Sequence, residues 1–178
     1  SLISRLLGQE QEAEARRVSA FSLYLGLTIA ALFAAGIAFF MEPVLALLGA
    51  GANTYGYARQ YALCVIVIGG IPTELSNVLA NLIRSIGRSR EASAGIILGG
   101  LLNIALDPLF MFVLLPDGRE VLGAGLATCI SNCIAFLFFA VVLARMGRGS
   151  VVTFSPKGGL PRRDSILAVF GVGIPSDI

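Results

Sequence analysis

The chain contains no histidine and only three cysteines in 178 residues. Cys64, Cys129 and Cys133 each lie inside an apolar stretch, where a thiol packs as a small hydrophobic side chain. Cysteines in such positions do not form a disulfide framework, and without histidine or a second thiol pair the usual ligand sets for a metal are missing. The lack of histidine and of a serine-centred elbow also argues against a hydrolase.

Charged residues are scarce, at 13% of the chain against 56% apolar residues, and the mean hydropathy is +0.85. These values lie outside the usual range for soluble domains. The net charge of +2 and the lack of a phosphate-binding glycine loop give no indication of nucleic-acid or nucleotide binding. The small residues at Gly95 and Gly99, and at Gly123 and Gly125, instead indicate close packing between helices.

Four apolar runs are long enough to cross about 30 Å of hydrocarbon as helices. Two of them are uncharged, and each of the other two contains a single acid, Glu74 or Asp107. The sequence therefore predicts an all-α, polytopic membrane bundle embedded in a lipid bilayer. The predicted spans are residues 18–41, 61–83, 92–115 and 122–144.

The segments between the spans are alternately rich and poor in basic residues, and the basic side of a membrane protein is normally cytoplasmic. Only Arg59 and Arg119 fall on the other side. The pattern predicts that residues 1–17, 84–91 and 145–165 are cytoplasmic, in the manner of a bacterial inner-membrane protein. The basic residues on that side are Arg5, Arg16, Arg17, Arg84, Arg88, Arg90, Arg145, Arg148, Lys157, Arg162 and Arg163.

The sequence opens without methionine and shows no cleavable signal peptide, so we expect it to be a fragment of a longer protein. Residues 1–144 form one helical lobe. Residues 145–165 are rich in glycine and proline, are longer than a usual helix connection, and are predicted to link two lobes. Residues 166–178 begin the next helix.

The strongest candidate site surrounds Asp107. An ionised acid near a helix centre costs about 2.5 to 3.5 kcal/mol on insertion scales, so such residues normally serve a pathway or a partner. Asn103 lies four residues earlier, on the same helix face. Pro108 cannot donate to the carbonyl of Ile104, which favours a bend there. The cluster predicts a cation site, with Na⁺ at Asp107 and Asn103 as one option, although a structural interhelical hydrogen bond is the alternative.

The preceding span contributes Glu74, Asn77 and Asn81 on one helix face, at spacings of three and four. Pro72 is predicted to bend that span by freeing the Ile68 carbonyl, and Glu74 is either part of the site, a packed neutral residue or the partner of an arginine. Thr128, in the last span, either completes the Asp107 site or bonds to its own preceding turn. Three polar helix faces predict a shared cavity.

Three segments in chain order then resemble a known family. They are Asn81-Leu-Ile-Arg84-Ser-Ile-Gly87, Leu102-Asn103-Ile-Ala-Leu-Asp107-Pro108-Leu-Phe110, and Gly123-Ala-Gly125-Leu-Ala127-Thr128. They look like the amino-terminal lobe of a multidrug and toxic compound extrusion (MATE) transporter. The resemblance implies a twelve-helix antiporter of two six-helix lobes, of which this chain covers the end of helix 2 to the start of helix 7.

The resemblance also implies a function. The family exports organic cations and other amphipathic drugs in exchange for H⁺ or Na⁺, with no further cofactor. Asn103 and Asp107 match its cation-site residues on helix 5, Thr128 matches the helix 6 contributor, and Asn81 matches the helix 4 asparagine, with Asn77 as the fallback. An essential aspartate on helix 1 of the family is absent from this chain, so transport requires the missing helices.

Two alternatives stay open at this stage. A lipid-linked oligosaccharide flippase of the same wider superfamily is expected to have more basic residues in its cavity than this chain shows. A non-transporting membrane scaffold would use the buried polar residues only to bind helices together. An enzyme is not expected.

Overall fold

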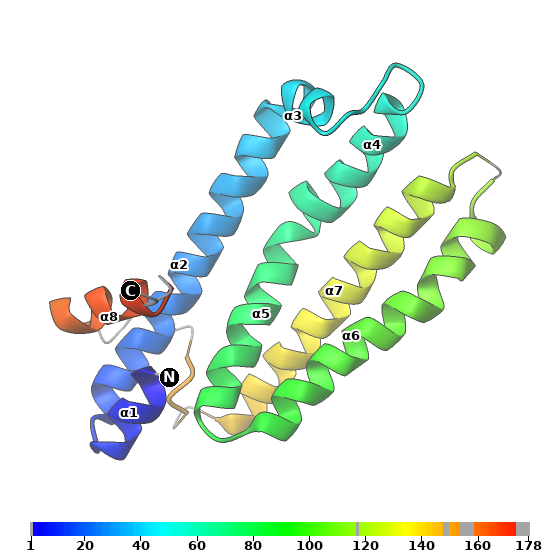
Figure 1. Ribbon diagram of the computed structural model, residues 1–178. Helices are drawn as coiled ribbons and strands as arrows, with labels where there is room; N and C mark the ends of the chain where they lie inside the picture. The colour runs from blue at the N-terminus through cyan, green and yellow to red at the C-terminus, as the bar shows by residue number, and fades with distance from the viewer. Residues whose placement is uncertain (1, 117, 148–149, 154–158, 174–178) are drawn as a thin grey trace.

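The computed structural model describes residues 2–116, 118–147, 150–153 and 159–173, and the secondary structure in these ranges is helical throughout. Long helices stand side by side in antiparallel order, and short helices cap the two ends of the bundle (Figure 1). In chain order the elements are α1 (Leu2–Gly8), α2 (Glu12–Phe39), α3 (Met41–Leu47), α4 (Tyr55–Ala62), the π-helical η1 (Leu63–Ile68), α5 (Gly70–Ser85), α6 (Ser89–Leu109), the π-helical η2 (Phe110–Leu114), α7 (Glu120–Met146) and α8 (Arg163–Gly173).

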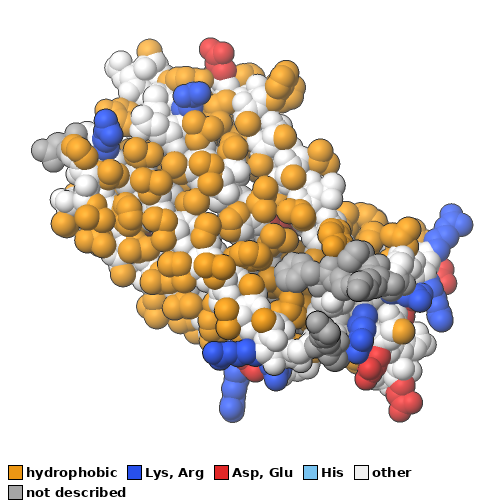
Figure 2. All heavy atoms as spheres, turned by 180° about the vertical axis from the view of Figure 1, so that it is seen from behind, with side chains coloured by type: hydrophobic (Ala, Val, Ile, Leu, Met, Phe, Trp, Pro, Cys, Tyr) orange, Lys and Arg blue, Asp and Glu red, His pale blue; other side chains and the backbone are white. Residues whose placement is uncertain are grey.

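Three helical stretches in the described ranges are long and apolar enough to cross a membrane: Glu12–Phe39, Ser89–Leu114 and Glu120–Met146. A fourth crosses if Tyr55–Ile68 and Gly70–Ser85, which meet at a 43° bend, count as one span. Three of the four predicted spans are thus found as long apolar helices, and the fourth, residues 61–83, lies within this bent pair. Hydrophobic side chains cover most of the face seen in Figure 2, and charged side chains gather toward its ends.

Two boundaries differ from the predicted ones. The first span was predicted to begin at residue 18, but α2 begins at Glu12, and the short α1 precedes it. Glu12 and Glu14 lie in the first turn of α2, where acids interact favourably with the helix dipole, so the helix begins before the apolar run. At the other end, α2 stops at Phe39, and Pro43 lies in the first turn of α3, where its missing N–H costs nothing.

α7 packs against α4, η1, α5, α6 and η2. Its small residues permit close contact. A Cβ at Gly123 would lie 2.7 Å from the backbone oxygen of Phe110 in η2, and a Cβ at Gly125 would lie 3.0 Å from Cβ of Cys64 in η1. The predicted role of these glycines in close helix packing is confirmed.

Candidate functional site

The polar residues of α6 and α7 meet inside the bundle. The side-chain amide of Asn103 donates from Nδ2 to Thr128 Oγ1 at 3.2 Å and, over a longer 3.4 Å, to Asp107 Oδ1. Thr128 in turn donates its hydroxyl proton to the carbonyl of Ala124 at 2.9 Å. Thr128 therefore bonds to its own preceding turn, as one alternative predicted, and also accepts a hydrogen bond from Asn103. Its part in a cation site stays a prediction.

Local sequence explains how these side chains are presented. Asn103 and Asp107 lie one turn apart on α6, so both point to the same side of the helix. The side chains of Asn103, Asp107 and Thr128 are all partly buried. Pro108 lies within α6 directly after Asp107, and the helix widens into η2 two residues later, at Phe110. The carboxylate thus stands next to an irregular stretch of backbone.

A second polar contact joins α7 to α5, and the sequence analysis did not predict it. Asn132 donates from Nδ2 to Thr73 Oγ1 at 2.7 Å, and the Thr73 hydroxyl donates to the carbonyl of Gly69 at 2.6 Å. Gly69 separates η1 from α5, at the bend that Pro72 was predicted to cause. Thr128 and Asn132 lie four residues apart on α7, so one face of this helix bonds to both neighbouring spans.

Glu74 lies elsewhere, at the contact between α5 and α2. A Cβ at Gly26 of α2 would be 2.9 Å from Cγ2 of Val78 and 4.0 Å from Oε1 of Glu74. Within the part of the chain that the structure describes, no basic residue forms an ion pair with this carboxylate. The predicted arginine partner is therefore not found there, and Glu74 is separate from the cluster around Asp107.

Asn77 and Asn81 are exposed and are not brought together with Asp107. Arg84 donates from Nη1 to Asn81 Oδ1 at 3.2 Å, within the last turn of α5. Asn81 is about 6 Å along the axis from the end of α5, whereas Asn103 is about 21 Å from the start of α6, and a short turn joins these two ends. The two asparagines therefore lie at different depths of the bundle.

Sequence reasoning also missed Glu14, which is only 5% exposed although it lies in the first turn of α2. Its carboxylate accepts hydrogen bonds from residues near the other end of the chain, Arg162 and Ser165. The only signal in the sequence was an acid four residues before a hydrophobic stretch, which is typical of an exposed helix start. Among the described residues, no group of three or more acids, cysteines or histidines is arranged to hold a metal ion.

Comparisons with known proteins agree with this architecture. The family profile described as MatE matches residues 1–109. The multidrug export protein MepA of Staphylococcus saprophyticus is 33% identical over 174 residues, which cover 98% of this chain and 37% of MepA. The chain therefore spans little more than a third of the length of this relative.

Solved structures give the same result. A structure described as the inward-facing conformation of a multidrug resistance MATE family transporter of the MOP superfamily is 28% identical with a TM-score of 0.88, over 99% of this chain and 39% of that one. A MOP superfamily transporter from Pyrococcus furiosus, whose description reports a binding pocket of reverse polarity and suggests a different function, is 27% identical with a TM-score of 0.83, over 96% and 37%. As the three sequence segments predicted, the chain belongs to the MATE family of membrane multidrug efflux transporters, which are not enzymes, and corresponds to a fragment of the amino-terminal part.

Proposed function

We propose that the full-length protein containing this chain is a secondary active antiporter, which exports cationic or amphipathic drugs in exchange for H⁺ or Na⁺. The observation that carries the proposal is the contact of Asn103 with both Asp107 and Thr128 inside the membrane spans. An acid at this depth is costly unless it has a partner or a pathway to serve. Carboxylate, amide and hydroxyl oxygens are also the ligand types that suit a hard cation.

The cluster offers a simple exchange. With the carboxylate protonated or bound to Na⁺, Asp107 is neutralised; after release it is ionised and is held by the Asn103 amide. Because Pro108 and η2 follow directly, a change at Asp107 alters the bend of the same helix. We propose Pro108, and Pro72 beside the Gly69 bend, as the hinges that couple occupancy to the inward and outward states.

The nature of the cargo rests on charge. Glu74 is a partly buried acid without a basic partner in the described ranges, and it lies in a different contact from Asp107. A negative group of this kind favours a positively charged cargo over an anionic one. We therefore assign Glu74 to cargo recognition and the Asp107 cluster to the coupling ion. Asn81 contributes to neither cluster in this conformation, and Asn77 stays the fallback for the helix 4 asparagine.

Residues 1–144 form the proposed first lobe, residues 145–165 its cytoplasmic linker, and residues 166–178 the start of helix 7. α7 ends at Met146 and α8 begins at Arg163, two and three residues from these limits. The sequence Gly-Ile-Pro-Thr-Glu-Leu of residues 70–75 is similar to Gly-Ile-Pro-Ser-Asp-Ile of residues 173–178, as expected if a second half begins there, but residues 174–178 lie outside the described residues. The basic residues of 1–17, 84–91 and 145–165 support a cytoplasmic location for this end of the bundle.

A second candidate is a flippase for lipid-linked oligosaccharides, within the same superfamily. This chain is also similar to the Pyrococcus furiosus transporter, whose description suggests a different function, and this similarity favours retaining the flippase as a second candidate. The two candidates differ in the charge of the cargo. Export of a cationic dye supports the antiporter, whereas movement of an anionic lipid-linked sugar with no dye efflux supports the flippase.

The test is efflux of a fluorescent cationic dye from pump-deficient cells that express the full-length parent. Asp107→Asn removes the charge but keeps the size of the side chain, and we expect efflux driven by a proton or sodium gradient to fall to the level of cells without the transporter. Glu42→Gln, an exposed acid at the other end of the bundle, is the matched control and should pump normally. Gradient-driven efflux retained by Asp107→Asn at equal membrane levels would contradict the assignment.

A further inference from the structure

The start of α2 forms hydrogen bonds with residues near the start of α8. One carboxylate oxygen of Glu14, Oε1, accepts the backbone N–H of Arg162 at 2.7 Å and the hydroxyl proton of Ser165 at 2.8 Å. The other oxygen, Oε2, faces Nη1 of Arg17 at 3.6 Å. We call this group of Glu14, Arg162 and Ser165 the Glu14 latch. It joins residues 148 and 151 positions apart in the sequence.

The latch acts on the beginning of α8. The backbone N–H of Ile166 bonds to the carbonyl of Arg162, so Arg162 is the N-cap residue of that helix. The first N–H groups of a helix have no partner within the helix, and an N-cap side chain usually supplies one. Here the cap comes from α2, and the negative carboxylate also suits the positive end of the helix dipole.

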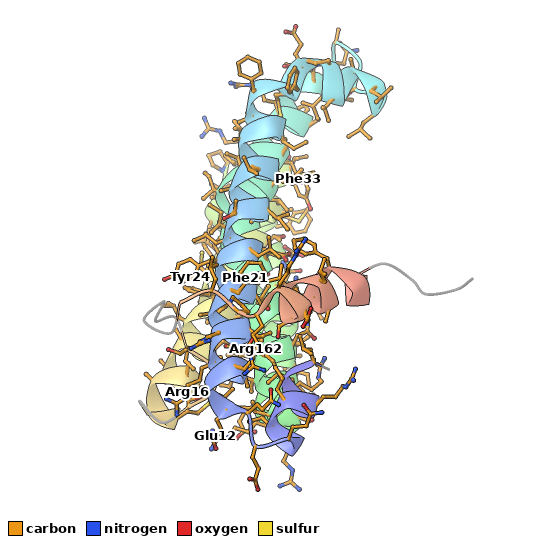
Figure 3. The ribbon with its side chains drawn as sticks, turned by 90° about the vertical axis from the view of Figure 1, so that its left-hand side faces the viewer. Glu12, Arg16, Phe21, Tyr24, Phe33 and Arg162 are labelled. Carbon is orange, nitrogen blue, oxygen red and sulfur yellow. The ribbon has the colours of Figure 1, made fainter. Side chains whose placement is uncertain are left out.

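A second contact holds the middle of the linker on α2. The backbone N–H of Thr153 donates to Oγ of Ser19, a fully buried side chain one turn beyond Glu14, at 3.3 Å. Val152 is 1% exposed and packs in the same core cluster as Val18 and Leu23. Figures 1 and 3 show α8 lying across α2, with Arg162 beside it above the level of Arg16.

This arrangement is specific rather than incidental. A buried carboxylate is strongly destabilising unless its oxygens accept hydrogen bonds, and both oxygens of Glu14 have partners. Glu12, one of its neighbours in the same turn, is exposed and forms no hydrogen bond with the described residues of the linker. The position of Glu14 on α2, rather than its charge alone, therefore selects where α8 starts.

We propose that Glu14 is a positioning residue of the transport cycle, which fixes the start of α8 to the first lobe so that movement of this lobe is passed to the rest of the transporter. The inference rests on the proposed antiport function. It assigns no contact of Glu14 with the coupling ion or the cargo. Loss of the latch slows the conformational cycle and leaves the ion site of Asp107 intact.

The first test is limited proteolysis of the purified full-length parent by trypsin, with the Arg162–Arg163 bond followed by mass spectrometry. Cleavage after Arg90, near the start of α6, serves as the internal reference. Hydrogen bonds to a charged group are stronger than those between neutral groups, so we expect Glu14→Ala to raise cleavage at Arg162 by about tenfold or more. Glu12→Gln is the matched control and should leave it unchanged. Equal cleavage in the two variants would overturn the latch.

Ser165→Ala keeps the test valid if Glu14→Ala does not fold, because it removes one hydroxyl from the latch and no charge. It should raise cleavage at Arg162 by a smaller factor. In the double variant the loss of Ser165 should add nothing to the loss of Glu14, because both changes remove the same bond. Fully additive effects would show that the two side chains do not act together.

The second test is dye efflux by the same variants in pump-deficient cells. Glu14→Ala should lower the maximal rate several-fold, while the concentration of coupling ion that gives the half-maximal rate stays the same. Normal efflux by a variant with a released latch would overturn the positioning role. If the unaltered parent exports no dye at all, the proposed antiport function is wrong. The proteolysis test does not depend on transport, so it still shows separately whether the latch exists.

Discussion

Asn103 and Asn81 are similar side chains in neighbouring spans, and depth within the bundle separates them. Asn103 bonds to Asp107 and Thr128, whereas Asn81 accepts from Arg84 near a helix end and is exposed. Asn81 was matched to a family asparagine by its place in the sequence. The axial rise of the two helices places it about 15 Å away from Asn103 along the bundle. Single residues therefore have to be assigned by depth as well as by order.

Alanine at these two positions tests the difference. We expect Asn103→Ala to raise the concentration of coupling ion needed for half-maximal efflux by about tenfold, a cost of about 1.4 kcal/mol. Asn81→Ala should leave it unchanged. Interhelical hydrogen bonds in membranes average about 0.6 kcal/mol, so neither variant should unfold. The measurement is dye efflux across a series of sodium concentrations and pH values, and an equal effect of the two substitutions would contradict this placement.

At the scale of the elements, α7 holds the irregular segments of its neighbours. Gly123 lies against η2, Gly125 lies against η1, and the side chains of Thr128 and Asn132 bond to α6 and α5. Each π-helical segment is followed or preceded by a proline in the same span. The two proposed hinges therefore share one supporting helix.

The α6 and α7 contact provides a prediction about stability. A Cβ at Gly95 would clash with the ring of Phe139, whose side chain is 1% exposed and cannot easily move. Gly95→Ala should therefore lower the free energy of unfolding by about 1–3 kcal/mol. Gly100, on the same helix, has open space at its Cβ position and should accept alanine. Thermal unfolding of the purified parent compares the two, and equal melting temperatures would show that the α6 and α7 contact adjusts freely.

At the scale of the whole molecule, apolar and charged side chains are separated along the bundle axis. Side chains such as Leu32, Ile104 and Phe112 are well exposed between the ends, as expected for surfaces that meet lipid or the remaining helices of the protein. α1, the turn between α5 and α6, the end of α7 and the start of α8 meet at one end of the bundle (Figure 1). That end carries most of the arginines.

The orientation of the bundle is tested by labelling in cells. The three native cysteines are replaced by alanine, and a single cysteine is placed at Asn53, in the exposed loop before α4, or at Arg88, in the exposed turn before α6. We expect a membrane-impermeant maleimide to label Asn53→Cys in intact cells, and Arg88→Cys only after permeabilisation. The reverse result would invert the proposed topology.

The sequence by itself determined the membrane spans, the order of the helices and the Asn103, Asp107 and Thr128 group, and its three family segments predicted the family that the comparisons confirm. These features depend on composition, run length and spacing along one helix, which are local properties. Only the tertiary structure decided the contact of Asn132 with Thr73, the separation of Glu74 from Asp107, the depth of Asn81, and the latch at Glu14. Each of these features depends on how helices that are distant in the sequence pack together. The first turn of α2 is an example: local sequence does not decide whether Glu12 or Glu14 is buried, and only packing determines which partner the buried acid meets.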